Sequence, residues 1–325
     1  MSRPSLARLA ALLLLASCRA SEFAPVEREP YVLVLGTAQD GGRPQLGCDA
    51  ECCRSARAEP ERARRVTSLL LCDPRDGRRW LFDCSPDIEA QLGDARSEPS
   101  TRASAGPRPP LVDGIFLTHA HMGHYAGLLE LGREAHAARD LPTWVSERFA
   151  AFLLSNAPWS ALVEERRLDL RRLEPGVPVA LAQDLWVTPF LVPHRDEYSD
   201  TFGFEIRGPR RTLVYLPDID KWERWDQLEG PGAVERLLAR CDVALLDGCF
   251  YADGEIPGRP MADIPHPFIT ESLARFAPLA PSARAKIWFT HLNHTNPAAD
   301  PGPERELVEA SGMHVLADGA RFSLE

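Results

Sequence analysis

One short run of histidines constrains this chain more than any other part of its sequence. Residues 118–127 read Thr-His-Ala-His-Met-Gly-His-Tyr-Ala-Gly. They follow an apolar segment, residues 111–117, that predicts a buried strand. They lead into residues 125–136, whose leucines and charged opposite face predict an amphipathic helix. The sequence therefore predicts a strand–loop–helix unit with three histidines on its loop.

The spacing of these histidines is typical of metal ligands. His119 and His121 point to the same side of an extended chain, and His124 joins them on the first helical turn. Neutral imidazole binds zinc, iron and similar metals, and catalytic sites keep a coordination position open for water. The alternative is three solvated loop histidines, but a position between a strand and a helix favours the metal site.

Composition narrows the class of protein. The chain has 325 residues, of which 44% are hydrophobic and 26% charged, as in an ordinary globular protein. Its net charge of −10 argues against an extended nucleic-acid surface, so we expect a small-molecule substrate and no nucleic acid. A phosphate-bearing substrate remains open, because a metal supplies local positive charge. Oligomeric state is open as well.

The first eighteen residues predict export. Arg3 and Arg8 precede an apolar run, residues 9–16, and the segment ends at Cys18. This pattern resembles a bacterial lipoprotein signal, in which cleavage precedes a cysteine that becomes lipid-modified. We therefore expect a signal at 1–18, a tether at 19–30 and one domain at 31–325. The lipid on Cys18 would hold the protein at a membrane, facing the periplasm; if the signal is not used, the chain stays in the cytoplasm.

Strands and helices alternate along the rest of the chain, which predicts a layered α/β sandwich. Strands are expected at residues 31–35, 66–72, 80–84, 115–118, 143–145, 185–192, 202–206, 212–216, 243–246 and 287–289. Helices are expected at residues 125–138, 146–155, 232–240 and 270–276, and a surface loop at 93–110.

Three histidines on one loop need partner ligands from other strand ends. His194, Asp218 and His291 each follow a predicted strand, and His266 precedes the predicted helix at 270–276. Each of them alone is as readily a surface or cap residue. Their order after the histidine loop favours a shared site.

That order resembles the metallo-β-lactamase superfamily, whose motif HxHxDH is followed by a histidine, a bridging aspartate and a last histidine. The resemblance implies a four-layer αββα sandwich with the site at the edge between two sheets. It implies that one metal is held by a first set of ligands, His119, His121 and His194. A second metal would be held by His124 and His291, with Asp218 bridging the two ions.

The chain departs from this motif at one position. Gly123 stands where the motif has aspartate, so the second metal loses an anionic ligand. Either that site is weak, or another group such as Asp40 or His294 completes it, or the protein holds one metal. We expect one or two zinc ions, with iron or manganese as alternatives.

Within the superfamily, residues 31–325 resemble coenzyme PQQ (pyrroloquinoline quinone) synthesis protein B and its relatives. The resemblance rests on residues 36–42, 44–48, 85–88 and 291–297. The usual members of that family lack the first two histidines and keep Asp-His, whereas this chain keeps the histidines. The reaction therefore need not be shared.

A cysteine cluster near the start also resembles this family. In related phosphodiesterases such a cluster holds a structural zinc, which the resemblance implies for Cys48, Cys52 and Cys53. A disulfide or buried thiols are the alternatives.

The expected reaction is metal-dependent hydrolysis of an ester, phosphodiester or related bond. A metal lowers the pKa of bound water towards about 7, so that hydroxide is available as nucleophile. Asp218 would bridge the metals or act as base, and His266 or His294 would protonate the leaving group.

The resemblance also implies that three further acids, Asp83, Asp87 and Asp247, fix imidazole orientation, and turn capping is the alternative for each. Two other functions stay open: a non-haem-iron oxygenase in cofactor biosynthesis, and a membrane-tethered carrier of small molecules without catalysis.

Overall fold

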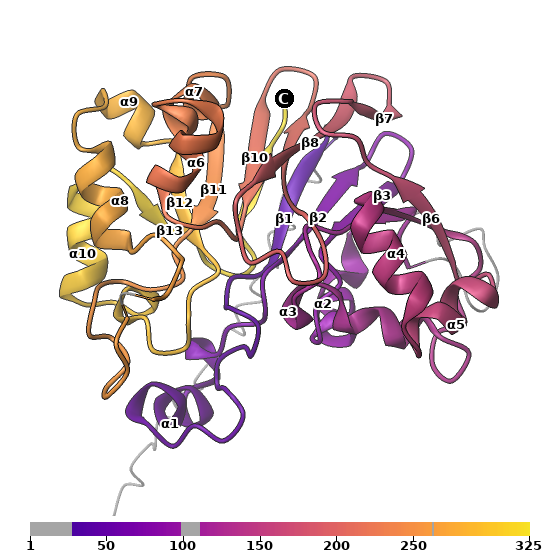
Figure 1. Cartoon of the computed structure of the whole chain (residues 1–325), viewed down its shortest axis with the longest axis horizontal. Helices are drawn as coiled ribbons and strands as arrows, with labels where there is room; N and C mark the ends of the chain where they lie inside the picture. Colours follow the sequence, from indigo (N-terminus) through magenta and orange to yellow (C-terminus); the bar gives the residue numbers. More distant parts are fainter. Residues whose placement is uncertain (1–27, 99–110, 262) are drawn as a thin grey trace, which may run out of the picture.

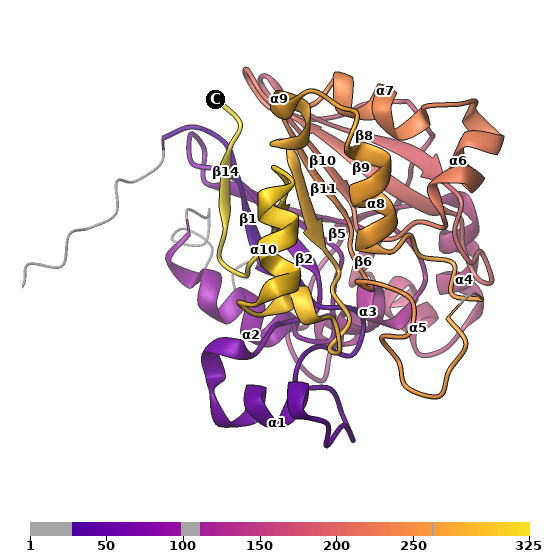
Figure 2. The same ribbon diagram turned by 90° about the vertical axis from the view of Figure 1, so that its left-hand side faces the viewer.

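Two β-sheets lie face to face with helices on their outer faces (Figures 1 and 2). The computed structural model describes residues 28–98, 111–261 and 263–325. Its architecture confirms the predicted α/β four-layer sandwich. The signal predicted at 1–18 and the tether up to residue 27 lie outside the described residues. None of the described helices is long and apolar enough to cross a membrane.

The first sheet has seven strands, and strands from both ends of the chain meet in it. Its order is β14 (Arg321–Ser323), β1 (Tyr31–Gly36), β2 (Ser68–Asp73), β3 (Arg78–Phe82), β4 (Gly114–Phe116), β5 (Leu141–Val145), β6 (Leu168–Arg172). The strands from β3 to β6 are parallel, whereas β14, β1, β2 and β3 pair antiparallel.

The second sheet also has seven strands. Its order is β13 (His314–Val315), β12 (Ile287–Thr290), β11 (Val243–Asp247), β10 (Thr212–Leu216), β9 (Thr201–Arg207), β8 (Leu185–Val192), β7 (Val179–Ala182). The strands from β10 to β13 are parallel, and the others antiparallel.

Alternating side chains of the central strands enter two different cores, which is why these strands are largely apolar. In β1, Val32 and Val34 face the core between the sheets, and Leu33 and Leu35 face the outer helices. The inner core also holds aromatic side chains such as Phe204 of the second sheet.

The helices divide between the two outer faces. Over the first sheet lie α2 (Ile88–Asp94), α3 (Met122–Tyr125), η4 (Ala126–Leu131), α4 (Glu147–Ser155) and α5 (Trp159–Glu164). Over the second lie α6 (Trp222–Glu229), α7 (Ala233–Ala239), α8 (Ile269–Phe276), α9 (Pro281–Arg284) and α10 (Pro303–Ala310). The remaining short elements are α1 (Glu51–Ala58), η1 (Pro60–Arg62), η2 (Ala95–Ser97) and η5 (Pro297–Ala299).

The helix predicted at 125–138 is wrong. The chain forms one α-helical turn, α3, then the 3₁₀ segment η4, and continues as turns. The carbonyl of His124 accepts the N–H of Cys84 at 2.8 Å, and the N–H of Gly127 donates to the carbonyl of Cys84 at 2.9 Å. These two bonds tie the segment to the loop after β3 and take backbone groups that a continuous helix would use.

The loop predicted at 93–110 is also wrong in its first part. Residues 93–97 belong to the end of α2 and to η2. Residues 99–110 lie outside the described part of the chain.

Candidate metal centre

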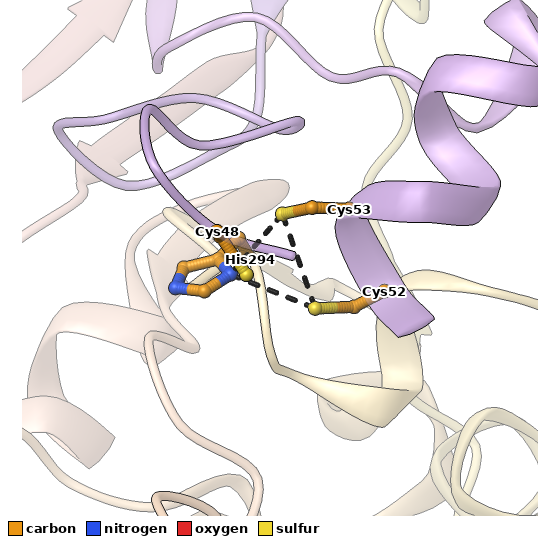
Figure 3. A group of neighbouring side chains, drawn as sticks. All are labelled: Cys48, Cys52, Cys53 and His294. Atoms are coloured by element: carbon orange, nitrogen blue, oxygen red, sulfur yellow. Dashed lines mark hydrogen bonds between the residues drawn. The ribbon is translucent and has the colours of Figure 1, made fainter. Parts of the chain in front are cut away.

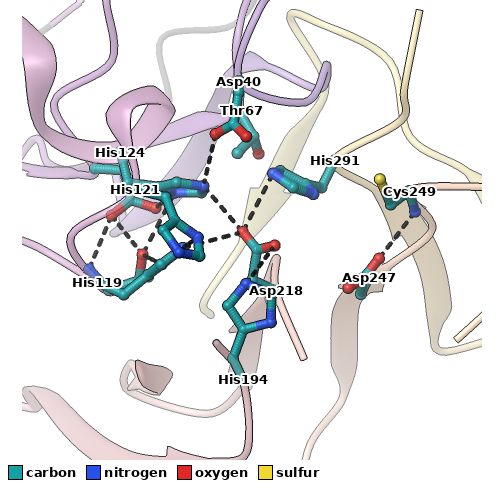
Figure 4. Close-up of polar contacts among 12 residues, drawn as sticks. Asp40, Thr67, His119, His121, His124, His194, Asp218, Asp247, Cys249 and His291 are labelled. Carbon is teal, nitrogen blue, oxygen red and sulfur yellow. Dashed lines mark hydrogen bonds and ion pairs between the residues drawn. The ribbon is translucent and has the colours of Figure 1, made fainter. Parts of the chain in front are cut away.

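The six predicted metal ligands meet at one edge of the sandwich, where several strands end (Figure 4). His119, His121 and His124 follow β4. The other three, His194, Asp218 and His291, follow β8, β10 and β12. Since β10 and β12 run parallel through β11, their carboxyl ends reach the same edge. All six are buried except His121, which is partly exposed.

Asp218 lies at the centre of the group. Its Oδ2 is 2.9 Å from Nε2 of His124 and 3.2 Å from Nε2 of His291. Its Oδ1 is 3.5 Å from Nε2 of His194. The two carboxylate oxygens therefore face different histidines, which is the arrangement of a carboxylate that can bridge two ions.

Asp83, in the loop after β3, sets the proton positions of two of the histidines. Nδ1 of His124 is 2.8 Å from Oδ2 of Asp83. A carboxylate only accepts, so Nδ1 carries the proton bound by Asp83, and Nε2 is the nitrogen that faces the centre. The hydroxyl of Thr118 donates to Oδ1 of Asp83 at 2.9 Å and accepts from Nδ1 of His119, also at 2.9 Å. His119 therefore also presents Nε2 as a ligand atom.

His121 is turned the opposite way. Its Nε2 lies 3.1 Å from Oε2 of Glu197, so this nitrogen donates and Nδ1 is the free ligand atom. That Nδ1 lies 2.9 Å from Nε2 of His119. On His194, Nδ1 faces Oδ1 of Asp220 at 3.4 Å, and Nε2 faces Asp218.

These spacings fit a divalent metal. Two ligands of a tetrahedral zinc ion, bonded at about 2.0–2.1 Å, lie about 3.3 Å apart. Compact groups of donors at this edge include His119 with His121 and His194, and His119 with His124 and Asp218. Nε2 of His124, of His194 and of His291 is buried without a hydrogen-bond partner among the described residues. Leaving so many buried polar atoms unsatisfied is costly, and a bound cation would satisfy them.

The charge states of three groups suit a cation. Burial lowers the pKa of His119 and of His291, so both imidazoles are neutral ligands at neutral pH. Burial opposes the charge of Asp218, but the neighbouring histidines, His291 first, hold the pKa of this carboxyl well below its usual range. Ionised carboxylate and neutral imidazole are the forms that bind metal. His124 instead must release a proton when a metal binds: burial opposes its charge, but Asp83 and Asp218 outweigh burial and raise the pKa of this imidazole.

His266 lies beside the six predicted ligands and forms a further compact group of donors with Cys249 and His291. Its Nδ1 is 2.7 Å from Oδ2 of Asp247 and 3.7 Å from Oδ1 of Asp218. Burial opposes its charge, but Asp247 outweighs burial and raises the pKa of His266 to about 9. The ring is thus held cationic and in a fixed orientation at the edge of the centre.

The structure places His294 elsewhere than expected. Its Nδ1 points to the cysteine cluster, 3.4 Å from Sγ of Cys53 and 3.6 Å from Sγ of Cys52 (Figure 3). The loop after β12 carries His291 to Asp218, whereas His294, three residues later, reaches the cysteines of α1. Its expected part as proton donor is thus not supported by its position.

Cys48, Cys52, Cys53 and His294 form a compact group with one donor atom each. Sγ of Cys52 and Sγ of Cys53 are 3.9 Å apart, close to the roughly 3.8 Å between two thiolates on tetrahedral zinc. None of the seven cysteines that the structure describes forms a disulfide. The Cys₃His donor set fits a structural zinc.

Sequence reasoning missed two residues that orient the histidines, Thr118 and Glu197, and a third residue, Asp220, that lies 3.4 Å from Nδ1 of His194 without a hydrogen bond. Thr118 stands directly before the histidine motif and Asp220 two residues after Asp218, but no sequence pattern around them indicates that they contact histidines. Of the acids expected to orient imidazoles, Asp83 and Asp247 do so. Asp87 instead accepts the N–H of Val66 at 2.8 Å.

Comparison with known proteins places this geometry in a family. The model of the β-lactamase superfamily domain matches residues 78–292. Coenzyme PQQ synthesis protein B of Methylobacterium sp. (strain 4-46) is 31% identical over 317 residues, which cover 90% of this chain and 99% of the relative.

Solved structures show the same fold. Zn²⁺-bound PqqB from Methylobacterium extorquens superposes with a TM-score of 0.74 at 24% identity, covering 90% of this chain and 100% of that one. A diphosphatase of the PhnP family has a TM-score of 0.61 at 20% identity, covering 90% and 96%. The chain therefore belongs to the metallo-β-lactamase superfamily and, within it, to the group of coenzyme PQQ synthesis protein B and its relatives.

Proposed function

We propose that this protein is a metal-dependent hydrolase that cleaves an ester, phosphodiester or related bond in a small molecule. The observation that carries the proposal is the position of Asp218, whose two oxygens face different buried histidines. Such a centre, with imidazoles held by outer partners and left without hydrogen bonds at their inner nitrogens, is a costly arrangement without a metal. Relatives named for synthesis of a cofactor support a small-molecule substrate.

Zinc is the proposed metal. One ion would be held by His119, His121 and His194, and a second by His124 and His291. Asp218 would be a ligand of both ions. Imidazole nitrogen with few carboxylates is a donor set that zinc prefers, and the similar PqqB from Methylobacterium extorquens was solved with bound Zn²⁺. When bound, the metal supplies Lewis acidity to the scissile group and makes water a stronger nucleophile.

The protein groups would divide the proton transfers. Asp218 stays ionised and is placed to accept a proton from the attacking water. His266, held by Asp247 and 3.7 Å from Asp218, is placed to donate a proton to the leaving group. Asp247 acts as a positioning residue, because it touches the imidazole and not the reacting atoms.

The test combines metal analysis with a substrate panel. The purified protein is loaded with zinc, its metal content is measured by mass spectrometry, and hydrolysis of nitrophenyl esters and phosphodiesters is followed. His119→Ala is expected to lose both metal and activity. Zinc-loaded protein that hydrolyses no member of the panel, or iron-loaded protein that consumes dioxygen, would overturn the proposal in favour of an oxygenase or a carrier.

The role of His266 has a separate readout. His266→Gln is expected to slow hydrolysis of substrates with poor leaving groups, such as alkyl esters, while sparing nitrophenyl substrates that need no protonation. An equal loss for both kinds of leaving group would contradict the proton-donor role.

We also propose that the protein is exported and anchored through a lipid on Cys18, on the periplasmic side of the membrane. The arginines and apolar run that precede this cysteine support the proposal. Labelling with radioactive palmitate is expected for the wild type and not for Cys18→Ser. Unlabelled wild-type protein in the cytoplasmic fraction would support the cytoplasmic alternative.

A further inference from the structure

The turn after β1 places Asp40 against the histidine loop. Gly123 stands where the superfamily motif has aspartate, and a Cβ atom on residue 123 would lie 2.3 Å from Oδ1 of Asp40. The same Cβ would lie 2.6 Å from the Cα of Asp40. Both distances are far inside van der Waals contact, so a side chain at 123 and the present position of Asp40 exclude each other. Asp40 therefore occupies the space that a side chain at position 123 would need.

The Asp40 carboxylate points to the ligand atoms that the missing aspartate would have joined. Oδ1 of Asp40 lies 3.8 Å from Nε2 of His124, and Asp40, His124 and His291 form one compact donor group (Figure 4). This oxygen is buried and has no hydrogen-bond partner among the described residues. Nε2 of His124 and Nε2 of His291 are likewise buried without a hydrogen-bond partner among the described residues. Three such buried atoms around one point are a donor set that a cation would satisfy.

The backbone holds Asp40 in this place. The N–H of Gln39 donates to the carbonyl of Leu292 at 2.9 Å, and the N–H of Leu292 donates to the carbonyl of Thr37 at 2.8 Å. The segment before Asp40 is thus bonded to the residue that follows His291. A turn closed by Gly42, whose N–H donates to Gln39 at 2.8 Å and whose φ is +65°, then directs the chain away.

We propose that Asp40 is a ligand of a second metal ion, together with His124, His291 and Oδ2 of Asp218. The carboxylate that the motif lacks at 123 is supplied from a different loop, 83 positions earlier in the chain, at the same place in space. Two carboxylates then balance the charge of the divalent ion, and the protein binds two metals at this edge. The inference rests on the proposed function, because it assumes a metal at the neighbouring histidines.

The experiment compares metal binding by the full chain with that of three variants. Asp40→Asn keeps the size of the side chain and removes its charge. Gly123→Ala keeps every donor atom, but its methyl group displaces Asp40. Asp169→Asn is the matched control, because this acid is exposed on β6 and pairs with Arg171. Zinc is titrated against a competing chelator, bound zinc is counted by mass spectrometry, and circular dichroism checks folding.

The wild type is expected to bind two zinc ions besides the one on the cysteine cluster, whose contribution is the same in all variants. Asp40→Asn and Gly123→Ala are expected to lose one ion, with its affinity reduced at least as much as by loss of an outer-shell partner, about 10–100-fold. Asp169→Asn is expected to match the wild type.

The other outcomes separate the two proposals. Unchanged zinc binding by folded Asp40→Asn would overturn the role of Asp40. One zinc ion at the histidines in both wild type and Asp40→Asn would overturn it as well, while the proposed hydrolase would stand as a mononuclear enzyme. No zinc at the histidines of the wild type would overturn both proposals.

Discussion

Asp83→Asn tests how hydrogen bonds from outside the centre fix the position of the proton on its histidine rings. Asp83 accepts four hydrogen bonds: from the N–H and the hydroxyl of Thr118, each at 2.9 Å, from Nδ1 of His124 at 2.8 Å and from the hydroxyl of Tyr215 at 3.0 Å. It has a φ of +62°, a conformation that asparagine tolerates well. The substitution therefore changes the hydrogen bonds and not the backbone.

Asparagine can accept on one side only. If its oxygen keeps the two bonds from Thr118, its NH₂ group faces Tyr215 and Nδ1 of His124. The hydroxyl of Tyr215 can turn towards Thr67, 3.4 Å away. His124 must instead accept at Nδ1, which moves its proton to Nε2, the atom 2.9 Å from Asp218. A protonated Nε2 cannot bind metal.

The expected effect follows from this change of tautomer. Zinc affinity should fall about 10–100-fold, which is about 1.4–2.7 kcal/mol. The metal-free protein should lose about 1–3 kcal/mol of unfolding free energy, because hydrogen bonds to the ionised carboxylate of Asp83 are replaced by weaker bonds to a neutral amide. Chelator competition measures the first quantity and urea denaturation the second.

Tyr215→Phe is the control, since it removes the other donor to Oδ2 of Asp83 and leaves the proton of His124 at Nδ1. Long-range nitrogen NMR of the histidine rings shows the tautomer directly. Asp83→Asn protein with wild-type zinc affinity and a proton still at Nδ1 of His124 would refute the reasoning.

Three further predictions concern stability. Burial opposes ionisation of Glu98, but hydrogen bonds from Arg321 and Tyr31 outweigh burial and lower the pKa of this carboxyl. The ionised carboxylate therefore stabilises the fold above the ordinary pKa of about 4.3, and this stabilisation is lost as the pH falls through the pKa of the folded state. Glu98→Gln should flatten the stability profile between about pH 5 and pH 3 in urea titrations, and a profile identical to the wild type would contradict this. Leu245→Ala, in the core between the sheets, should lower the unfolding free energy by about 2–5 kcal/mol in the same assay, and a loss below about 1 kcal/mol would argue against close packing there. Cys52→Ser should remove one zinc ion and lower the melting temperature, whereas an unchanged zinc count would show that the cysteine cluster holds no metal.

Local sequence patterns were sufficient for most of the central strands. β1, β10 and β11 are nearly continuous apolar runs because they are buried on both faces, and this shows in the sequence without knowledge of their partners. The short edge strands β13 and β14, and the exposed β6, carry no such signal. Their pairing depends on neighbours far away in the chain.

The helix predicted after the histidine loop shows the limit of periodicity. Leucines at helical spacing are present in η4, yet the hydrogen bonds between this segment and Cys84 redirect its backbone. A tertiary contact with the loop after β3 decided the local conformation.

By itself, the sequence determined the kind of protein and the donors of its centre: a strand followed by a loop with three histidines, then His194, Asp218 and His291 in the order of the superfamily. The histidine motif is local, because three of the donors come from one short loop, and their spacing is visible in the chain.

Only the tertiary structure decided how these donors are completed. It brought His294 to Cys53 and Cys52, which stand 241 and 242 positions earlier in the chain. It also set His124 against Asp83 and placed Asp40 in the space beside Gly123. No local pattern encodes such pairs, because the contacts arise where strands distant in sequence end at the same edge of two packed sheets.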